Sequence, residues 1–368
     1  MSRPPRVSAR LPDFPWDTLG AAKQHAAAHP GGIVDLSIGT PVDPTPASVQ
    51  SALRAAADSP GYPTVWGTPD LRAAIIGYLT RRCHAVGLHD SCVLPTVGSK
   101  ELVASLPAQL GVGLGHTVLV PEVGYPTYAV GALLAGADVL ASDATVSAGP
   151  LDVPLVWLNS PANPTGRVLP IGHLRKVVAW ARERDAVVAV DECYFELGWD
   201  LEPRSVLDPE VNGGSLDNVL AVHSLSKRSN LAGYRAGFVA GDPRVVTELL
   251  EIRRHAGLMV PGPVQQAMCA ALGDDDHVAE QRERYRARRS ALRGTLEAAG
   301  FRIDHSEGSL YLWATRGEPG WDSVDWFAER GILVAPGDFY GTAGACHVRL
   351  ALTATDERVA AAVSRLSP

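Results

Sequence analysis

The sequence predicts an α/β fold in which helices cover both faces of a mostly parallel sheet. Short apolar runs with the length and composition of buried strands recur along the central part of the chain, at residues 117–120, 155–158, 186–190, 219–222 and 237–240. Between two of these runs, residues 171–184 carry apolar side chains at helical spacing. Strands that alternate with helices form parallel sheets, and such sheets bind ligands beyond the carboxyl ends of their strands.

A change in composition after residue 273 predicts a second, smaller unit. A long arginine-rich helix is expected over about 278–299, and β-like pieces follow it near 301–303, 310–313, 332–334 and 347–350. The first 43 residues are rich in proline and glycine and have little sheet character. We therefore expect a large domain over 44–273, a small α+β domain over 274–368, and an N-terminal segment, 1–43, that packs on the small domain and at the mouth of the site.

Composition excludes several classes of function. The chain of 368 residues has a net charge of −7, which argues against nucleic acid as its main partner. The basic cluster 282–289 is interrupted by Glu283 and is typical of a solvated helix face. No apolar run approaches the roughly 20 residues of a membrane span, so we expect a cytoplasmic protein with no membrane partner. The five cysteines lack metal-site spacing, which favours reduced thiols and no metal centre.

Lys227 is the first candidate for chemistry. It is one of only four lysines among 33 basic residues, and it follows the predicted strand 219–222 in a run rich in hydroxyl groups. Unlike arginine, lysine can form an imine once burial or a neighbouring cation lowers its pKa. Ser224, Ser226 and Arg235 are donors suited to a phosphate. Taken alone, such a run is more typical of a surface lysine. Other residues are needed to distinguish a cofactor anchor from a surface role for Lys227.

Polar side chains also follow two neighbouring predicted strands. Asp191 follows the run 186–190, where a carboxylate needs a cation such as a protonated pyridine nitrogen, although a helix cap is an equally simple role. The rigid loop Asn159–Gly166 follows 155–158 and presents amide donors. Tyr194 has the spacing to point at the same place, but a lone tyrosine there more often belongs to the core.

Two further motifs follow strand-like runs nearer the N-terminus. Gly98, Ser99 and Lys100 open an apolar helical stretch, and backbone N–H groups with a hydroxyl at a helix start suit a phosphate. Tyr125 follows the run 117–120 and can stack flat on an aromatic ring. Each motif is weak alone, since glycine and serine begin many helices. Together the strand ends offer phosphate donors, a stacking ring, an amide, a carboxylate and an amine.

In this combination the chain resembles the class I/II aminotransferases, which are fold-type I enzymes dependent on pyridoxal 5′-phosphate (PLP). The resemblance covers almost the whole chain and implies a seven-stranded sheet in the large domain. Its motifs are Tyr62 with Gly67 and 71–75, Asn159–Gly166, Asp191 with Tyr194, Ser224–Lys227 with Arg235, and Val348–Leu350. Their joint presence is far more specific than any one of them.

The resemblance implies a role for each residue. Lys227 would bind PLP covalently and transfer the substrate proton, with Asp191 on the pyridine nitrogen and Tyr125 stacked on the ring. Asn163 and Tyr194 would bind the ring 3-oxygen. The phosphate would be surrounded by Gly98, Ser99, Lys100, Ser224 and Arg235, and by Tyr62 from the other subunit of a homodimer. Lys100 departs from the usual small or hydroxylated residue, so the role of its side chain is open.

The substrate carboxylate is assigned in the same way. Arg349 would bind it with help from the backbone of Gly39, although an arginine at this position is often a structural ion-pair partner, and only the resemblance assigns it to the substrate. Segments 11–17 and 34–43 resemble actinobacterial N-succinyldiaminopimelate aminotransferases. This implies N-succinyl-LL-2,6-diaminopimelate as amino donor in lysine and diaminopimelate biosynthesis, with glutamate and 2-oxoglutarate as the second pair.

Alternatives remain open at this point. The enzyme could act on aspartate or on aromatic or branched-chain amino acids, or it could be a PLP-dependent C–S lyase on the same fold. Groups that read a distal carboxylate are expected among Arg10, Lys23 and Arg228. A DNA-binding regulator with an aminotransferase-like domain is disfavoured, because the first 30 or so residues are neither strongly basic nor typical of a helix-turn-helix.

Overall fold

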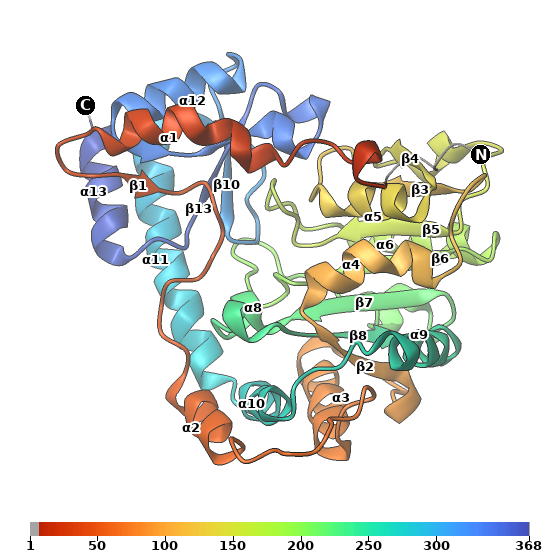
Figure 1. The fold of residues 1–368 in the computed structure, drawn as a ribbon. Helices are drawn as coiled ribbons and strands as arrows, with labels where there is room; N and C mark the ends of the chain where they lie inside the picture. The colour runs from red at the N-terminus through yellow and green to blue at the C-terminus, as the bar shows by residue number, and fades with distance from the viewer. Residues whose placement is uncertain (1–6, 368) are drawn as a thin grey trace, which may run out of the picture.

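The computed structural model describes residues 7–367 and is built around a seven-stranded sheet (Figure 1). In spatial order its strands are β2 (Val93–Val97), β8 (Ala236–Gly241), β7 (Val219–Ser224), β6 (Val187–Asp191), β5 (Leu155–Asn159), β3 (Thr117–Val120) and β4 (Asp138–Ala141). Neighbouring strands are parallel except that β8 is antiparallel to β7 and β2. The mostly parallel seven-stranded sheet is therefore confirmed.

Strand β4 was not predicted from the sequence. It lies at the edge of the sheet and pairs only with β3 among the described strands. Its terminal residues Asp138 and Ala141 are exposed and the two between them are only partly buried. An edge strand of this kind has no continuous buried run, so its sequence carries little strand signal.

Helices cover both faces of the large sheet (Figure 1). One core, between the sheet and one helical layer, includes buried residues of α3 (Pro69–Cys83), α6 (Ile171–Arg182) and α10 (Gly262–Gly273). The opposite core includes residues of α4 (Ser99–Gln109), α5 (Thr127–Ala135) and α9 (Pro243–Ala256). The remaining helices of this part are α2 (Ala47–Ala55) and the short α7 (Pro209–Asn212) and α8 (Leu225–Arg228).

Local signals in the sequence explain where the covering helices begin and end. Helix α3 starts with Pro69, which needs no hydrogen-bond partner at that position, and the Thr68 hydroxyl accepts from the Leu71 N–H. Helix α9 is capped by Asp242 and ends at Gly257 in the left-handed region, with φ +68°. These ends fix how each strand leads into its covering helix.

A second, smaller sheet forms the other unit. Its strands, in spatial order, are β12 (Ala335–Pro336), β13 (Val348–Ala351), β10 (Tyr311–Thr315) and β9 (Arg302–Ile303), all antiparallel. Helices α11 (Asp276–Ala298), α12 (Gly320–Glu329) and α13 (Asp356–Leu366) belong to the same part of the chain. Short 3₁₀ turns lie at Val7–Arg10, Pro15–Leu19, Asp90–Cys92, Thr145–Ala148, Ala232–Tyr234, Gly337–Tyr340 and Thr342–Gly344.

The N-terminal part of the chain joins this smaller unit. Helix α1 (Gly20–Ala27) lies beside α12, and both bury side chains in the core of the small sheet (Figure 1). Strand β1 (Val34–Asp35) pairs in parallel with β11 (Ile332–Leu333). The segment thus has a two-residue strand where the sequence showed little sheet character. We propose that the chain divides into an N-terminal segment, 1–43, a large domain, 44–273, and a small domain, 274–368; residues 1–6 and 368 lie outside the described range.

Within residues 7–367, none of the helices combines the length and apolar character of a membrane span.

Asp43 ties the end of the N-terminal segment to helix α11. The Arg288 guanidinium donates two hydrogen bonds to its carboxylate, at 2.8 and 2.7 Å, and Gln281 donates a third at 2.7 Å. The Arg288 and Asp43 side chains are only 3% and 10% exposed. Burial alone would raise the pKa of Asp43, but the bonds from Arg288 and Gln281 hold that pKa below its ordinary value.

Replacing this carboxylate should be costly. Asp43→Asn is expected to lower the free energy of unfolding by roughly 3 kcal/mol, because it removes the buried partner of Arg288 and leaves only the exposed Asp356 carboxylate. Since the folded pKa is lowered, the stabilisation is present above the ordinary carboxyl pKa and is lost as the pH falls through the folded pKa. Denaturant unfolding at about pH 7 and about pH 3 should show the difference from wild type shrinking in acid.

Asp356 provides a matched control. Its carboxylate also accepts from Arg288, at 2.7 Å, but its side chain is 77% exposed. Asp356→Asn should therefore change the free energy of unfolding by less than about 1 kcal/mol. Equal losses in the two variants would contradict the anchoring role of Asp43.

Candidate active site

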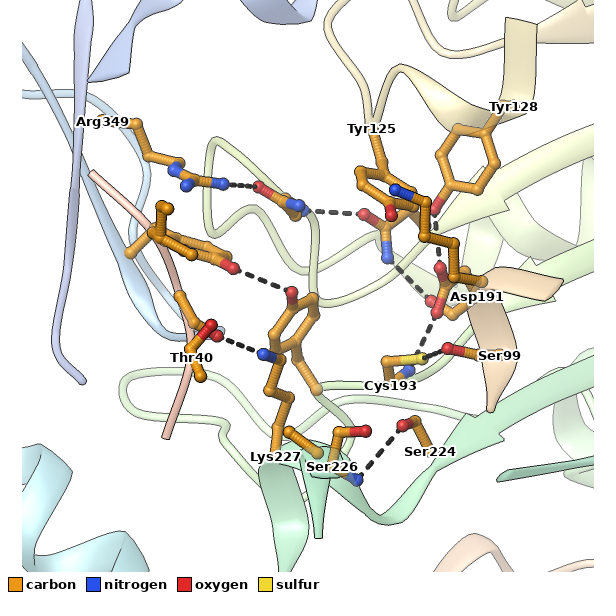
Figure 2. A pocket seen from close by; sticks show the side chains of 18 of the residues that line it. Thr40, Ser99, Tyr125, Tyr128, Asp191, Cys193, Ser224, Ser226, Lys227 and Arg349 are labelled. Carbon is orange, nitrogen blue, oxygen red and sulfur yellow. Dashed lines mark hydrogen bonds between the residues drawn. The ribbon is translucent and has the colours of Figure 1, made fainter. Parts of the chain in front are cut away.

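A cavity of about 490 Å³ lies at the carboxyl ends of the central strands (Figure 2). Figure 2 shows Lys227, Tyr125 and Arg349 converging on it from different parts of the fold. The predicted site residues that line it are Gly39, Ser99, Lys100, Tyr125, Asn163, Asp191, Tyr194, Ser224, Lys227, Arg235 and Arg349. The structure thus brings together residues that are far apart in the sequence.

Lys227 lies on the short helix α8, directly after strand β7. The Ser224 hydroxyl caps this helix by accepting from the Ser226 N–H at 3.2 Å. The Lys227 amine donates to the Gly39 carbonyl oxygen. Burial lowers the pKa of the Lys227 ammonium, so a larger fraction of the amine is neutral and nucleophilic at a given pH.

Asp191 lies at the end of strand β6, on the floor of the cavity. The Tyr128 hydroxyl donates to one carboxylate oxygen at 2.8 Å, and the Cys193 N–H donates to the other at 3.1 Å. Burial raises the pKa of Asp191, and these hydrogen bonds oppose the increase. No basic side chain among residues 7–367 forms an ion pair with Asp191. The carboxylate therefore suits a cationic partner such as a protonated pyridine nitrogen.

Arg349, from β13, lies on the far side of the cavity from Asp191 (Figure 2). Its guanidinium donates to the Asn163 side-chain oxygen at 2.9 Å and to the Ser37 carbonyl at 2.6 Å. It lies over the ring of Tyr311, 4.1 Å from the centroid, and is 3% exposed. No carboxylate within residues 7–367 pairs with Arg349, so this arginine does not form a structural ion pair. A buried cation that lacks a counter-ion fits the carboxylate of a substrate.

Amide and phenol groups lie between these charges. Asn163 is held by its own N–H, which donates to the Asn159 side-chain oxygen at 2.7 Å. The Tyr194 and Tyr311 hydroxyls share a hydrogen bond of 3.0 Å. Asn159 also donates to the Asp191 carbonyl at 2.8 Å, which ties the loop to the neighbouring strand. Tyr194 is thus a cavity residue rather than only a core residue.

The start of helix α4 forms a cradle with Arg235. Gly98 precedes the helix with φ +74° and offers no side-chain cap to its first N–H groups. A Cβ atom on Gly98 would lie 2.3 Å from the Arg235 guanidinium and would displace it, and the positive φ of this residue also favours glycine. Arg235 is held by a 2.9 Å bond from its guanidinium to the Ala232 carbonyl. With Ser99 and Ser224 nearby on the cavity wall, these donors fit a phosphate.

Lys100 and two aromatic residues lie at the edge of the cavity. The Lys100 amine is 6.0 Å from the Tyr125 ring centroid and 5.9 Å from that of Phe14. Its side chain is exposed, and no carboxylate among residues 7–367 pairs with it. Phe14 and Trp16 of the N-terminal segment also line the cavity.

Some expectations about the pocket were wrong or incomplete. Arg10, Lys23 and Arg228 do not line the cavity. Arg228 is buried elsewhere and donates to the Ala271 carbonyl at 2.6 Å and to Asp275 at 3.1 Å. Tyr62, which was predicted to reach the phosphate of the partner subunit, is 99% exposed and lies outside the cavity of its own chain, so its role stays a prediction.

The cavity also contains residues that the sequence did not single out. Tyr128 follows Tyr125 by three positions and therefore lies near the same face of the chain, a spacing that could have revealed it. Tyr311 had no such signal, because it lies in a short strand of the other unit. Cys193, expected only as a packed thiol, lies 3.3 Å from the Ser99 hydroxyl.

Comparison with known proteins agrees with this geometry. A sequence model of the family "Aminotransferase class I and II" matches residues 32–366. The chain is 61% identical to the "Probable aminotransferase Rv1178" of Mycobacterium tuberculosis, over 98% of this chain and 86% of that protein. It is 58% identical to the 4-dedimethylamino-4-oxo-anhydrotetracycline transaminase OxyQ of Streptomyces rimosus, over 97% of this chain and 99% of that protein.

The fold has equally clear counterparts. A structure named "probable N-succinyldiaminopimelate aminotransferase", from Thermus thermophilus, superposes with a TM-score of 0.86 at 26% identity. The match covers 96% of this chain and 99% of that one. The chain therefore belongs to the class I and II aminotransferases, fold-type I enzymes that use PLP to transfer amino groups.

Proposed function

We propose that the enzyme transfers an amino group from N-succinyl-LL-2,6-diaminopimelate to 2-oxoglutarate. The observation that carries this proposal is a cavity lined by four cationic side chains, Lys100, Lys227, Arg235 and Arg349. PLP bound to the lysine and the phosphate cradle engages two of them, and the α-carboxylate engages a third. One cation is left over, which suits substrates that carry a second, distal carboxylate.

The groups around the cofactor have distinct tasks. When bound, PLP supplies an electron sink that stabilises negative charge at the substrate Cα. With PLP bound, Asp191 would hold a proton on the pyridine nitrogen, and Tyr125 would cover the ring face. Asn163 and Tyr194 would donate to the ring 3-oxygen, and Lys227 would anchor the cofactor and move the proton at the substrate Cα.

Arg349 fixes the substrate for that proton transfer. Its planar guanidinium can bind a carboxylate with two parallel hydrogen bonds, which lysine cannot do. The hydrogen bond with Asn163 and the ring of Tyr311 hold the guanidinium in one orientation. The substrate Cα is thereby directed toward Lys227 rather than toward the open side of the cavity.

Lys100 is the residue to which we assign the distal carboxylate. It projects from the first turn of helix α4 at the cavity edge, beside the rings of Phe14 and Tyr125. A long flexible ammonium side chain can meet carboxylates at different depths, such as those of glutamate and of the succinyl group. The name of the Thermus neighbour supports this substrate class for a protein of the same fold.

A second candidate is favoured by one specific observation. The 58% identity to the Streptomyces rimosus enzyme extends over nearly the whole of both chains. Its substrate, as named, is a rigid polycyclic ketone, and Phe14 and Trp16 at the cavity edge offer apolar surfaces for such a ring system. On this alternative Lys100 would have no distal carboxylate to bind.

A substrate panel separates the candidates. Formation of glutamate from 2-oxoglutarate should be fastest with N-succinyl-LL-2,6-diaminopimelate, with kcat/KM for aspartate, phenylalanine and valine lower by about 100-fold or more. The reverse reaction is run with glutamate and 4-dedimethylamino-4-oxo-anhydrotetracycline. Faster turnover of that ketone or of aspartate would reject our substrate. Release of ammonia, a 2-oxo acid and a thiol from a sulfur-containing amino acid such as cystathionine, without 2-oxoglutarate, would instead identify the C–S lyase.

Lys100→Met tests the assignment of the distal carboxylate. We expect kcat/KM to fall by about 10- to 100-fold for glutamate and for the succinylated substrate, the range for one lost hydrogen bond to a charged group. Activity with norvaline, which has no distal carboxylate, should change by less than about threefold. Lys23→Met is the matched control, because Lys23 is exposed on α1 and outside the cavity. An equal fall for norvaline would contradict the assignment.

We further propose that the enzyme is a cytoplasmic homodimer in which Tyr62 reaches the phosphate of the partner subunit. The almost complete exposure of this large side chain supports a role outside its own chain. Tyr62→Phe should weaken PLP retention by about fivefold to tenfold, the effect of one hydrogen bond. Cofactor titration of the apoenzyme measures this, and unchanged affinity would argue against the contact.

A further inference from the structure

Tyr311 lies between two groups of the active site that come from different units of the fold. It is the first residue of strand β10 in the small sheet and is 3% exposed. Its hydroxyl lies 3.0 Å from that of Tyr194, which follows strand β6 of the large sheet. The Arg349 guanidinium lies over its ring, 4.1 Å from the centroid. One buried side chain therefore contacts both the proposed carboxylate ligand and a proposed cofactor ligand.

The pairing of the small sheet explains why the phenol ring and the guanidinium meet. Strand β10 is antiparallel to β13, with Tyr311 opposite Ala351 and Trp313 opposite Arg349. Alternate residues of a strand point to the same face, so Tyr311 and Arg349 are diagonal neighbours on one face of the sheet. Aromatic and long side chains can touch across this diagonal. The register of the two strands thus places the ring beside Arg349.

The hydroxyl end of Tyr311 packs against the N-terminal segment. A Cβ atom on Gly39 would lie 2.2 Å from the Tyr311 hydroxyl oxygen and 2.8 Å from two atoms of its ring, so glycine leaves the space that the phenol occupies. The Gly39 carbonyl accepts from the Lys227 amine on its other side chain contact. Contacts at the ring face and at the hydroxyl therefore restrict the phenol to one position beside Tyr194.

The direction of the hydrogen bond between the two phenols follows from the proposed role of Tyr194. A tyrosine hydroxyl has one proton to donate and can also accept. If Tyr194 donates its proton to the ring 3-oxygen of PLP, its oxygen must accept from Tyr311. A hydroxyl that accepts a hydrogen bond is polarised and becomes a stronger donor. Tyr311 then strengthens a bond to the cofactor without touching the cofactor oxygen itself.

We propose that Tyr311 is a positioning residue with two separable functions. Its ring orients Arg349 toward the substrate carboxylate, and its hydroxyl orients Tyr194 toward the cofactor 3-oxygen. This inference rests on the roles proposed above for Arg349 and Tyr194. Because both contacts come from one side chain, the carboxylate site and the cofactor site keep a fixed placement relative to each other.

Tyr311→Phe and Tyr311→Leu separate the two functions in the PLP-loaded enzyme. The first measurement is the pH midpoint of the visible absorption band, which reports the proton on the nitrogen that links Lys227 to PLP. A weaker donor at the 3-oxygen leaves more negative charge there, and this charge holds the proton more tightly. Both variants should therefore raise the midpoint by about 0.5 to 1 pH unit, the range for one hydrogen bond.

The second measurement is the affinity for glutarate, a dicarboxylate without an amino group, by calorimetric titration. Tyr311→Phe keeps the ring and should leave the Kd for glutarate within about twofold of wild type, which also shows that the site is folded. Tyr311→Leu removes the ring and should raise this Kd by about fivefold or more, as expected for the loss of a buried cation–π contact.

Tyr340→Phe is the matched control. The Arg349 guanidinium also lies over the Tyr340 ring, at 4.9 Å from the centroid, but the buried Tyr340 hydroxyl has no hydrogen-bond partner within residues 7–367. Removing that hydroxyl should leave both the pH midpoint and the Kd for glutarate at their wild-type values.

Tyr194→Phe distinguishes failure of this inference from failure of the proposed cofactor site. A raised midpoint in Tyr194→Phe but not in Tyr311→Phe overturns the role of the Tyr311 hydroxyl and leaves that of Tyr194 standing. No shift in either variant overturns both. In the double variant the change at Tyr311 should add nothing to the shift from Tyr194→Phe, and an additive shift would contradict the proposal.

Arg349→Lys does the same for the substrate side, because lysine cannot bind a carboxylate with two parallel hydrogen bonds. Weaker glutarate binding in Arg349→Lys but not in Tyr311→Leu overturns the role of the ring alone. Unchanged binding in both variants overturns the proposed role of Arg349 as well.

Discussion

Lys227→Ala enzyme is expected to retain no covalently attached cofactor and to lose transamination by about 10⁴-fold or more. The variant lacks both the amine that holds PLP and the group that moves the substrate proton. The protein should lose its yellow colour on dialysis, and kcat should fall with any amino donor. Visible absorbance and glutamate formation measure the two effects separately.

Lys227→Arg is the sharper form of this test. Arginine keeps a positive charge at the same position, but its guanidinium stays protonated and is no nucleophile. We expect the same loss as for alanine, which distinguishes the chemistry of the amine from a role in charge balance alone. Full activity of either variant would rule out Lys227 as the anchor.

Asp191→Asn is expected to lower kcat by about 10²- to 10³-fold while the protein stays folded. Asparagine has nearly the same shape, and its oxygen can accept from the Cys193 N–H while its NH2 group donates to the Tyr128 hydroxyl oxygen, but a neutral amide cannot stabilise a proton on the pyridine nitrogen. Steady-state kinetics, together with thermal unfolding, would separate lost chemistry from lost structure. Wild-type kcat would contradict the assignment.

Tyr128→Phe serves as the matched control for Asp191. It removes the 2.8 Å hydrogen bond and leaves the carboxylate in place. One such bond contributes roughly 1–2 kcal/mol, so kcat should fall by about 5- to 30-fold. A larger loss in Tyr128→Phe than in Asp191→Asn would mean that the phenol, not the carboxylate, is the important group.

Much of the site could be predicted from the sequence because parallel strands end at the same edge of a sheet. Asp191, Asn159 and Ser224 each end a buried strand, and the regular alternation of apolar runs and helices made those ends visible. Lys227 follows the last of these strands by three residues. That these residues meet at one edge of the sheet therefore followed from the predicted strands, whereas the order of the strands came from the structure.

Other features depend on orientations that a linear pattern does not contain. Arg228 is adjacent to Lys227, but successive residues of a helix point about 100° apart, so Arg228 is buried against Asp275 instead of facing the cavity. Tyr311 and Arg349 reach the site only through the packing of the smaller unit on the larger one.

Reduction of the PLP-loaded enzyme with borohydride, followed by peptide mapping, tests the central claim most directly. The reagent fixes the cofactor on the lysine that holds it, and the cavity contains two lysines, Lys227 and Lys100. We predict the modified peptide to be the one that contains Lys227, in the wild type and in Lys100→Met. Modification of Lys100, or of no lysine at all, would contradict the account.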